Sequence, residues 1–574
     1  MNPHRAIFPG SSSRTERLVA LFAALVLVAM TSSCSFTDDR SMDYYVEMRD
    51  GERLLTRVWT PAEDGKLPAV LSRGYGPGYG DDHDRFTRAE YVYVGQQTRG
   101  RGGIDGSRFF TDGRDGYDTI SWIVRQPWSN GEVVMYGKSY WGMTQWLAAI
   151  ENHPNLKAII PQNISSDLWQ NGYYHNGALS LAMTATGRAF SGDHPGIPWR
   201  DYFMHRPLSD LDRLGLRESN RLWQDYVKHD SFDTYWRQIT VRNDGGDGKY
   251  GMIRIPVFLH SGWFDYYAGS ALKSFQQLRS NGNHAVRINI GASNHLSGKP
   301  AGRAFPGGTR DEIGLALDWL DEVLGNAAAN QASPVRIYVM GANEWQDFET
   351  WPPASAEATR LYLHASDQRF GKLAPELPGN DEPASFTYDP ADPCPTLGGS
   401  HSFLREIPGL IQAGSVDQRA NESRDDVLIY STDVLAEEIR LIGPVTFTLY
   451  ASSSAVDTDF TVKLLDVFPD GAAYNISEGI VRARFRDSVY EEEKLLKPGE
   501  VYRFDIELHP TANVFKAGHR IRIHVSSSNW PLWDGNLNTG ESPGDAIRSV
   551  AAHQVVYQDT VRPSNLTISV VPND

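Results

Sequence analysis

A serine follows a buried strand at the point where a helix is expected to begin. The apolar run EVVMYG ends at Gly137, Ser139 comes two residues later, and the helical stretch WGMTQWLAAIE follows. A serine on a sharp strand-to-helix turn is displayed above the sheet edge, and the next backbone N–H, that of Tyr140, can face a developing oxyanion. The pattern predicts a nucleophile for acyl transfer, although Trp141 replaces the second glycine of G-x-S-x-G. A serine that only caps the helix is the alternative interpretation.

Two further side chains follow later strands in the order expected of a serine triad. Asp265 comes after the strand IPVFLHS, and His295 comes after the next strand, AVRINIG. The carboxyl ends of parallel strands share one edge of a sheet, so both side chains are expected near Ser139. His295 would be the general base and Asp265 would orient its ring. His260 lies within its strand and is expected to be a packed core residue.

These residues need a parallel sheet to position them. From about residue 44 to 337, short continuous apolar runs alternate with amphipathic stretches, which is typical of parallel strands covered on both faces. The pattern therefore predicts an α/β domain over residues 42–170 and 251–350. The expected strands are 67–73, 91–97, 132–137, 156–162, 255–261, 285–291 and 334–341, and the expected helices are 115–125, 141–151, 269–278 and 311–324.

Two segments do not show this alternation of apolar runs and amphipathic stretches. Residues 171–250 are rich in Trp, Tyr, His, Arg and Asp and show no buried-strand signal, which predicts a helical cap over the sheet edge. After about residue 355, strict alternation of apolar and polar residues replaces the continuous runs, and Gly, Pro and Asp turns separate the segments. This change predicts a β jelly-roll domain over residues 355–574.

With the three residues placed, the chain resembles the family of cocaine esterase, α-amino-acid ester hydrolases and X-Pro dipeptidyl-peptidases, and is most similar to its cocaine-esterase-like members. The resemblance implies an α/β-hydrolase domain with a helical cap and a C-terminal jelly roll. It also accommodates Trp141, because the elbow of this family reads G-x-S-Y-x-G. The motifs that carry the resemblance are TRG (98–100), DGYDTISWIVRQPW (115–128), GKSYWGMTQW (137–146), SGWFD (261–265), YDPADPCPTLGG (388–399), SSSAVDTDFTVKLLDVFPDG (452–471) and VSSSNWP (525–531).

The resemblance further implies an oxyanion hole made by the Tyr140 backbone N–H and a tyrosine hydroxyl from the loop after the first core strand. Tyr75 is nearest to the family position, one residue earlier than an Arg-x-x-Tyr spacing would place it, and Tyr79 is the alternative. Gln97 stands where family members usually carry Asp before Thr-Arg-Gly. We expect this departure to affect the rigidity of the loop more than the chemistry.

The acyl-binding region is expected to be aromatic and uncharged. Relatives of the amino-acid ester hydrolase type place acidic residues two and three positions after the triad aspartate, where this chain has Tyr267 and Ala268. Asp167 is the nearest cap carboxylate. Aromatic side chains suit a neutral or aromatic acyl group. The side chains predicted to line the substrate pocket are Trp169, Tyr173, Tyr174, His175 and Tyr266.

Together these features predict a serine hydrolase that cleaves small carboxylic esters through an acyl-enzyme. No metal or organic cofactor is implied. An X-Pro dipeptidyl-peptidase or an amino-acid ester hydrolase remains open, as does a non-catalytic carbohydrate- or surface-binding protein, because jelly rolls are common in lectins. The length of 574 residues allows two or three domains, and the net charge of −16 argues against nucleic acid as a partner. The oligomeric state is not predicted.

The N-terminus resembles an export signal over residues 1–34. Arg14 and Arg17 precede the 13-residue apolar run Leu18–Met30, which is too short to span a bilayer but suits a signal peptide. Small residues then lead to Cys34, as in a bacterial lipobox, although Thr31 replaces the usual branched aliphatic residue. A lipid-anchored protein, a plain cleaved signal and an uncleaved anchor are the three alternatives. All three predict export to the cell envelope, the periplasm or the medium of a bacterium.

Overall fold

The computed structural model describes residues 41–61, 65–100, 110–189, 197–241, 248–326, 332–367, 369–401 and 412–572. Cys34 and the predicted signal segment lie outside these ranges, so the structure does not bear on them. Within the ranges, no helix has both the length and the apolar character needed to cross a bilayer.

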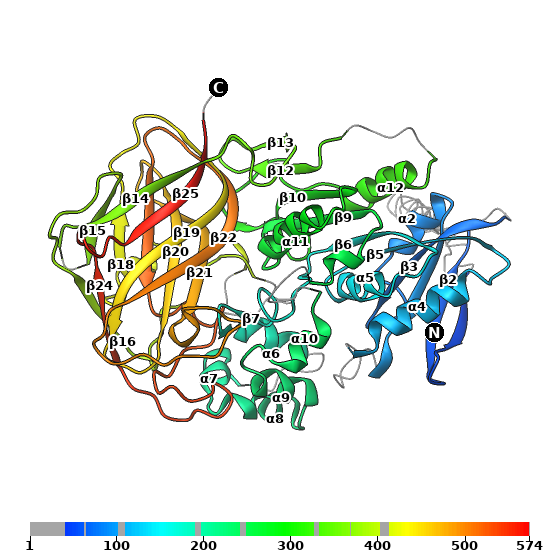
Figure 1. Ribbon diagram of the computed structural model, residues 1–574, viewed down its shortest axis with the longest axis horizontal. Coiled ribbons are helices and arrows are strands. Elements are labelled where there is room, and N and C mark those ends of the chain that lie inside the picture. The colour runs from blue at the N-terminus through cyan, green and yellow to red at the C-terminus, as the bar shows by residue number, and fades with distance from the viewer. Residues whose placement is uncertain are drawn as a thin grey trace, which may run out of the picture. The chain divides into compact units, whose positions relative to one another are not determined.

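A sheet of ten strands positions the predicted site, in the order β1-β2-β4-β3-β5-β6-β9-β10-β12-β13 (Figure 1). All pairings from β4 to β12 in this order are parallel, whereas the pairs β2–β4 and β12–β13 are antiparallel. The strands are β1 (Ser41–Glu47), β2 (Arg53–Trp59), β3 (Leu67–Gly74), β4 (Val92–Gln97), β5 (Ser129–Lys138), β6 (Leu156–Gln162), β9 (Val257–Phe264), β10 (Val286–Asn294), β12 (Val335–Val339) and β13 (Glu344–Phe348).

Helices cover both faces of this sheet, which explains the continuous apolar runs. In β5, Val133 and Met135 join one core with α4 (Asp112–Ile123), α5 (Tyr140–Ile150) and α11 (Ala268–Ser280). Val134 and Tyr136 point the other way and join a second core with α2 (Asp82–Arg88) and α12 (Glu312–Val323). Because successive side chains alternate between faces, a strand buried on both faces must be apolar at every position.

The cap lies between β6 and β9 and is built mostly of short helices. It also contains a small hairpin that the sequence reasoning did not predict, with Asn176 and Gly177 both at positive φ (44° and 86°) in its turn. An Asn-Gly pair is a strong hairpin signal, but each strand is only two residues long. The cap elements are β7 (Tyr174–His175), β8 (Ala178–Leu179), α6 (Leu181–Ala189), α7 (Trp199–Met204), η2 (Leu208–Asp210), α8 (Leu211–Leu216), α9 (Arg221–Lys228), α10 (Thr234–Ile239) and η3 (Tyr250–Met252).

The second domain is an eleven-stranded sheet that closes on itself, because β19 pairs with β25 as well as with β22 and β24. The pairings are antiparallel apart from β15–β18, and the interior is a separate apolar core. The predicted fold class, an α/β-hydrolase domain with a cap followed by a C-terminal β domain, is confirmed. The strands are β14 (Glu357–Ala365), β15 (Phe370–Ala374), β16 (Ala384–Tyr388), β18 (Leu428–Ser431), β19 (Ile439–Ser453), β20 (Asp459–Val467), β21 (Ala473–Arg482), β22 (Tyr502–Phe515), β23 (Arg520–Ser526), β24 (Ala552–Tyr557) and β25 (Asn565–Val571).

Backbone hydrogen bonds join the second domain to the first. Met340, just after β12, donates to Ala512 O at 2.9 Å and accepts from Val514 N at 2.8 Å. A two-stranded pairing of β11 (Ala301–Gly302) with β17 (Gly414–Ser415) adds a second connection. The β domain is therefore attached to the sheet that carries the predicted site.

Candidate active site

Ser139 lies alone between the end of β5 and the first residue of α5. Its backbone angles are φ 57° and ψ −126°, a conformation that costs free energy for any residue with a Cβ. Three hydrogen bonds hold it there: Ser139 N donates to Gln162 O at 2.8 Å, and Gly142 N and Met143 N donate to Ser139 O at 2.8 and 3.0 Å. This is the strained strand-to-helix geometry that is typical of a nucleophile elbow.

Close packing around Trp141 explains the glycines of this turn. A Cβ on Gly137, which has φ 152°, would lie 2.5 Å from the Cβ of Trp141. The Trp141 indole covers Gly74 at the end of β3, where an added Cβ would lie 2.2 Å from the ring. Gly142, one position after Trp141, acts as the second glycine of the elbow, because a Cβ added there would lie 2.7 Å from Ile164 Cγ2. Trp141 therefore fits this elbow because its side chain packs over the neighbouring strand end.

Asp265 and His295 are brought into direct contact at the ends of β9 and β10. His295 Nδ1 lies 2.9 Å from Asp265 Oδ1, and the other carboxylate oxygen accepts a hydrogen bond from Ser261 Oγ at 2.8 Å. Both residues are buried. Because a carboxylate accepts hydrogen bonds, this contact fits the tautomer with the proton on His295 Nδ1, in which Nε2 is the free acceptor of the ring.

Side-chain contacts also join the turn of His295 to the strand that leads into Ser139 and to the end of the neighbouring strand β6. Asn163, just after β6, donates from Nδ2 to His295 O at 2.6 Å. Lys138, the last residue of β5, hydrogen-bonds Ser297 Oγ. The three predicted triad residues thus gather at one sheet edge, although no hydrogen bond joins Ser139 Oγ to the His295 ring within the described part of the chain.

Tyr75 lies against Tyr140, the residue that follows Ser139. Its ring centroid is 4.8 Å from that of Tyr140 and 5.0 Å from that of Trp141, and 37% of the residue is exposed. Gln97 Nε2 donates to Tyr75 O at 3.1 Å, so the residue that departs from the family pattern supports the Tyr75 loop directly.

Tyr79 is placed differently. Its ring also contacts Trp141, with centroids 5.0 Å apart, and burial raises the pKa of its hydroxyl. The charged groups that act on it most are Lys138, Asp82 and Glu312, which belong to β5, α2 and α12. Tyr79 therefore faces a charged cluster beside the elbow, whereas Tyr75 lies over the start of α5.

Three of the five aromatic residues predicted to line the pocket are completely buried: Trp169, Tyr174 and Tyr266. The rings of Trp169 and Tyr174 pack 4.2 Å apart, and the Tyr266 hydroxyl hydrogen-bonds Ser180 Oγ. In this structure they present no surface to a substrate. A cap of short helices needs large apolar side chains for its own core, and Trp169 and Tyr174 supply two of them, while Tyr266 contacts the cap from the turn after β9.

The other two predicted pocket residues, His175 and Tyr173, differ in how deeply they are buried. His175 packs between the rings of His509 and Trp533, at 5.1 and 5.5 Å, and is buried against the β domain. Tyr173 stacks on Tyr226 with centroids 3.9 Å apart but keeps part of its surface exposed. Tyr173 is therefore the member of the predicted set that retains exposed surface.

Tyr267 is a neighbour of His295 that the sequence reasoning did not assign to the site. Its ring centroid lies 5.6 Å from that of His295, and its hydroxyl donates to Met183 Sδ of α6 at 3.4 Å. The signal was its place two positions after Asp265 in the same turn. Tyr267 thus connects His295 to the cap.

Asp167 is already committed to hydrogen bonds. Oδ1 accepts from the backbone N–H groups of Trp169 and Gln170, both at 3.0 Å. Oδ2 accepts from the hydroxyl of Tyr490, a residue of the β domain, at 2.8 Å. The residue is 4% exposed, so this carboxylate serves the cap rather than an open pocket.

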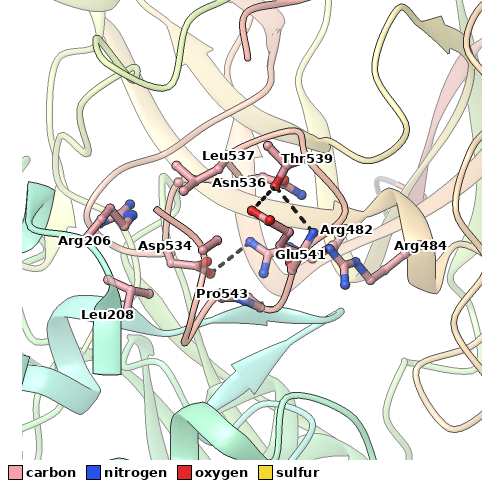
Figure 2. Close-up of a pocket in the computed structure, with 12 residues that line it drawn as sticks. Arg206, Leu208, Arg482, Arg484, Asp534, Asn536, Leu537, Thr539, Glu541 and Pro543 are labelled. Atoms are coloured by element: carbon pink, nitrogen blue, oxygen red, sulfur yellow. Dashed lines mark hydrogen bonds and ion pairs between the residues drawn. The ribbon is translucent and has the colours of Figure 1, made fainter. Parts of the chain in front are cut away.

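A separate cavity lies between the cap and the β domain (Figure 2). It is lined by Arg206, Arg482, Arg484 and Asp534, among others, with Arg482 Nη2 at 3.0 Å from Asp534 Oδ1. Its volume of about 10 Å³ has room for roughly one water molecule. None of the predicted site residues lines it. Across the described ranges, moreover, no three His, Cys, Asp or Glu side chains are grouped as metal ligands.

The fold and the elbow define an α/β-hydrolase of the serine type, and comparison with known proteins agrees. Residues 50–297 match the X-Pro dipeptidyl-peptidase (S15) family and residues 326–567 match the X-Pro dipeptidyl-peptidase C-terminal non-catalytic domain. Cocaine esterase of Rhodococcus sp. (strain MB1 Bresler) is 35% identical over 545 residues, which cover 86% of this chain and 92% of that protein.

Two solved structures share the whole architecture. An α-amino acid ester hydrolase superposes with a TM-score of 0.79 at 24% identity, covering 94% of this chain and 99% of that one. An aminopeptidase from a marine sediment Thaumarchaeota archaeon gives a TM-score of 0.76 at 25% identity, covering 93% and 96%. The chain belongs to the serine hydrolase family that includes cocaine esterase and the X-Pro dipeptidyl-peptidases.

Proposed function

We propose that this serine hydrolase cleaves carboxylic esters, with Ser139 as nucleophile, His295 as general base and Asp265 as the group that orients the base. The observation that carries the proposal is the strained turn of Ser139 at the same sheet edge as the 2.9 Å His295–Asp265 hydrogen bond. The similarity to cocaine esterase over most of the chain supports an ester as the bond attacked.

Acyl transfer then proceeds in two stages. His295 Nε2 takes the proton of Ser139 Oγ as this oxygen attacks the ester carbonyl, and the proton passes to the leaving alcohol as the acyl-enzyme forms. Water, deprotonated by the same nitrogen, releases the acid and restores the serine. The Tyr140 backbone N–H and the Tyr75 hydroxyl stabilise the oxyanion, an effect worth about 3–4 kcal/mol for one well-placed donor.

Replacement of the nucleophile tests this assignment. Ser139→Ala is expected to abolish ester turnover and covalent labelling by a fluorophosphonate without lowering the melting temperature, since only one oxygen is removed. Ser280→Ala, on the exposed end of α11, is the matched control and should behave as wild type. Labelling that persists in Ser139→Ala would contradict the proposal.

We further propose that the acyl group is neutral. A desolvated ammonium next to the reacting carbonyl needs a carboxylate aimed at it, because an unpaired buried charge costs several kcal/mol. The Asp167 carboxylate accepts two backbone N–H groups and the Tyr490 hydroxyl, and Tyr267, rather than an acid, lies beside His295. These contacts support neutral, apolar or aromatic acyl groups.

Matched substrates decide the preference. We expect kcat/KM for a phenylacetate ester to exceed that for the phenylglycine ester of the same alcohol by at least about tenfold, because the two differ only in the α-amine. An X-Pro anilide should be turned over more slowly still. A preference for either amine-bearing substrate would move the enzyme to the aminopeptidase-like branch of the family.

We also propose that the protein is exported and anchored by a lipid on Cys34. Support comes from the arginines before Leu18–Met30, the short apolar run and the cysteine that follows it. Mass spectrometry of the native N-terminus should find a diacylglyceryl-modified Cys34. An unmodified N-terminus beyond Cys34 would indicate plain secretion instead.

A further inference from the structure

Lys138 is a buried cation directly next to the nucleophile, and the acyl-transfer chemistry does not use it. It is the last residue of β5, and only 9% of it is exposed. Its Nζ contacts two other parts of the fold. It lies 3.0 Å from Glu312 Oε2 at the start of α12, and it donates to the Ser297 hydroxyl.

Ser297 is held in a fixed turn two residues after His295. Its φ of 61° is unusual for a serine, and its N–H donates to Asn294 O at 2.9 Å. The next N–H, from Gly298, donates to Asn294 Oδ1 at 3.0 Å. Because the turn is closed on itself, a restraint on the Ser297 hydroxyl is passed to the backbone of His295.

Asn163 provides a second attachment from the neighbouring strand. Its backbone, at φ 48°, directly follows Gln162, whose carbonyl accepts the Ser139 N–H. Its side-chain nitrogen donates to His295 O at 2.6 Å and lies 3.5 Å from Ser297 Oγ. The histidine turn is thus attached to β5 and to the end of β6, the two chain segments that hold Ser139.

We propose that Lys138 is a positioning residue for acyl transfer, which holds the turn of His295 against the strand of Ser139 through the Ser297 hydroxyl. The inference rests on the proposed function, because it presupposes that Ser139 and His295 react together. Glu312 keeps the lysine side chain directed at the turn, and Asn163 makes the same turn rigid from the other side.

The physical reason is that two quantities must be restrained separately: the orientation of the His295 ring and the distance from its Nε2 to Ser139 Oγ. Asp265 binds His295 Nδ1 and so fixes the orientation of the ring, but it belongs to the turn after β9, and its side-chain hydrogen bonds within the described ranges go to His295 and Ser261 rather than to the elbow. Proton transfer also needs Nε2 within hydrogen-bond distance of Ser139 Oγ. Misplacement of a catalytic group by about 1 Å can cost on the order of 100-fold in rate. The contact of Lys138 with Ser297 restrains this second distance.

Two variants remove the contact from opposite ends. We expect Lys138→Met and Ser297→Ala each to lower kcat for a neutral aryl ester by about 10- to 100-fold, with KM within about threefold of wild type. The double variant should lose no more than the worse single variant, since both changes remove the same Lys138–Ser297 contact, through which the proposed effect on His295 acts. Lys299→Met, an exposed lysine in the same loop, is the matched control and should keep wild-type kcat.

A change that acts through His295 has no effect once His295 is absent. In the His295→Ala background, Lys138→Met should therefore leave the residual turnover of an activated aryl ester unchanged, whereas general damage to the fold would lower it further. Lys138→Arg, which keeps a donor and a charge, should recover part of the lost kcat. If Lys138→Met proves unstable, the same measurements are made on Ser297→Ala, which loses a single oxygen.

Several results would overturn the inference: wild-type kcat in both single variants, a loss confined to KM, additive losses in the double variant, or a further loss in the His295→Ala background. The Ser139→Ala variant shows whether such a result contradicts only the role of Lys138 or the proposed function as well. If Ser139→Ala is inactive while Ser297→Ala matches wild type, only the role of Lys138 is wrong. If Ser139→Ala remains active, the proposed function itself fails.

Discussion

At the scale of single residues, two histidines on neighbouring strands have opposite environments. His295 follows β10 and pairs with Asp265, whereas His260 lies inside β9 with its ring 4.2 Å from that of Phe258. Burial lowers the pKa of His260 to about 4, so it is neutral at neutral pH. The position of each histidine along its strand therefore separates a candidate base from a core residue.

Alanine substitution should distinguish the two histidines. His295→Ala is expected to lower kcat by on the order of 10⁴-fold, since no base remains for Ser139, while its melting temperature stays near that of wild type. His260→Ala should leave a cavity and reduce the free energy of unfolding by about 2–4 kcal/mol, with kcat of the folded enzyme within a few-fold of wild type. Kinetics and urea denaturation of both variants check this, and an exchange of the two effects would refute it.

At the scale of elements, side-chain hydrogen bonds anchor the start of α5, directly after the turn of Ser139. The Tyr140 hydroxyl donates to Asp112 Oδ2 at 2.7 Å and lies 3.1 Å from Thr98 Oγ1, which joins α5 to the start of α4 and the end of β4. Arg73 of β3 adds a bond from Nη1 to Asp112 O at 2.7 Å. The N–H that would face an oxyanion thus belongs to a residue whose side chain is anchored to two neighbouring elements.

The tight packing of the elbow gives a prediction for Gly137. Gly137→Ala should lower the free energy of unfolding by about 2–4 kcal/mol, because the new Cβ would meet Trp141 Cβ at 2.5 Å and φ is positive. Gly65→Ala, with no atom within 4 Å of the added Cβ, is the control and should be neutral. Denaturant unfolding measures both, and wild-type stability in Gly137→Ala would show that the elbow is looser than the structure indicates.

At the scale of the whole molecule, buried histidines lie where the β domain meets the cap. Burial lowers the pKa of His509 to about 4 and that of its neighbour His175 well below its usual value. Glu507, Lys273 and Asp265 are the charged groups around His509. The unfolded chain, with a histidine pKa near 6.5, binds more protons than the native state between about pH 4 and 6.5. The contribution of these buried neutral histidines to the free energy of unfolding is therefore complete above pH 6.5 and is lost as the pH falls toward 4.

Removing one of these histidines should flatten the pH dependence of stability. We expect the free energy of unfolding of the wild type to fall from pH 7 to pH 5, and His509→Phe to reduce that slope by up to about 1.4 kcal/mol per pH unit. His553→Phe, which changes an exposed histidine, should leave the slope unchanged. Denaturation at pH 5, 6 and 7 tests this, and equal slopes in all three proteins would count against a neutral buried His509.

Local sequence alone predicted the sheet, the elbow and the order of the three site residues. A continuous apolar run, the turn at Gly137 and the place of Asp265 and His295 just after their strands are properties of contiguous segments. Parallel strands share an edge, so these local signals were enough to expect that the three residues would gather. The predicted fold class is confirmed for the same reason.

Tertiary structure decided what each remaining side chain does. Trp169 and Tyr174 are large aromatic residues of the kind that line substrate pockets, but here they form part of the core of the cap. The local sequence around a large aromatic residue does not show whether it lines a pocket or packs in a core. Asp167 meets Tyr490 across 323 positions of sequence, and Lys138 meets Ser297 across 159. Such contacts form only when distant segments fold against one another, because hydrogen bonding and burial depend on neighbours in space rather than in sequence.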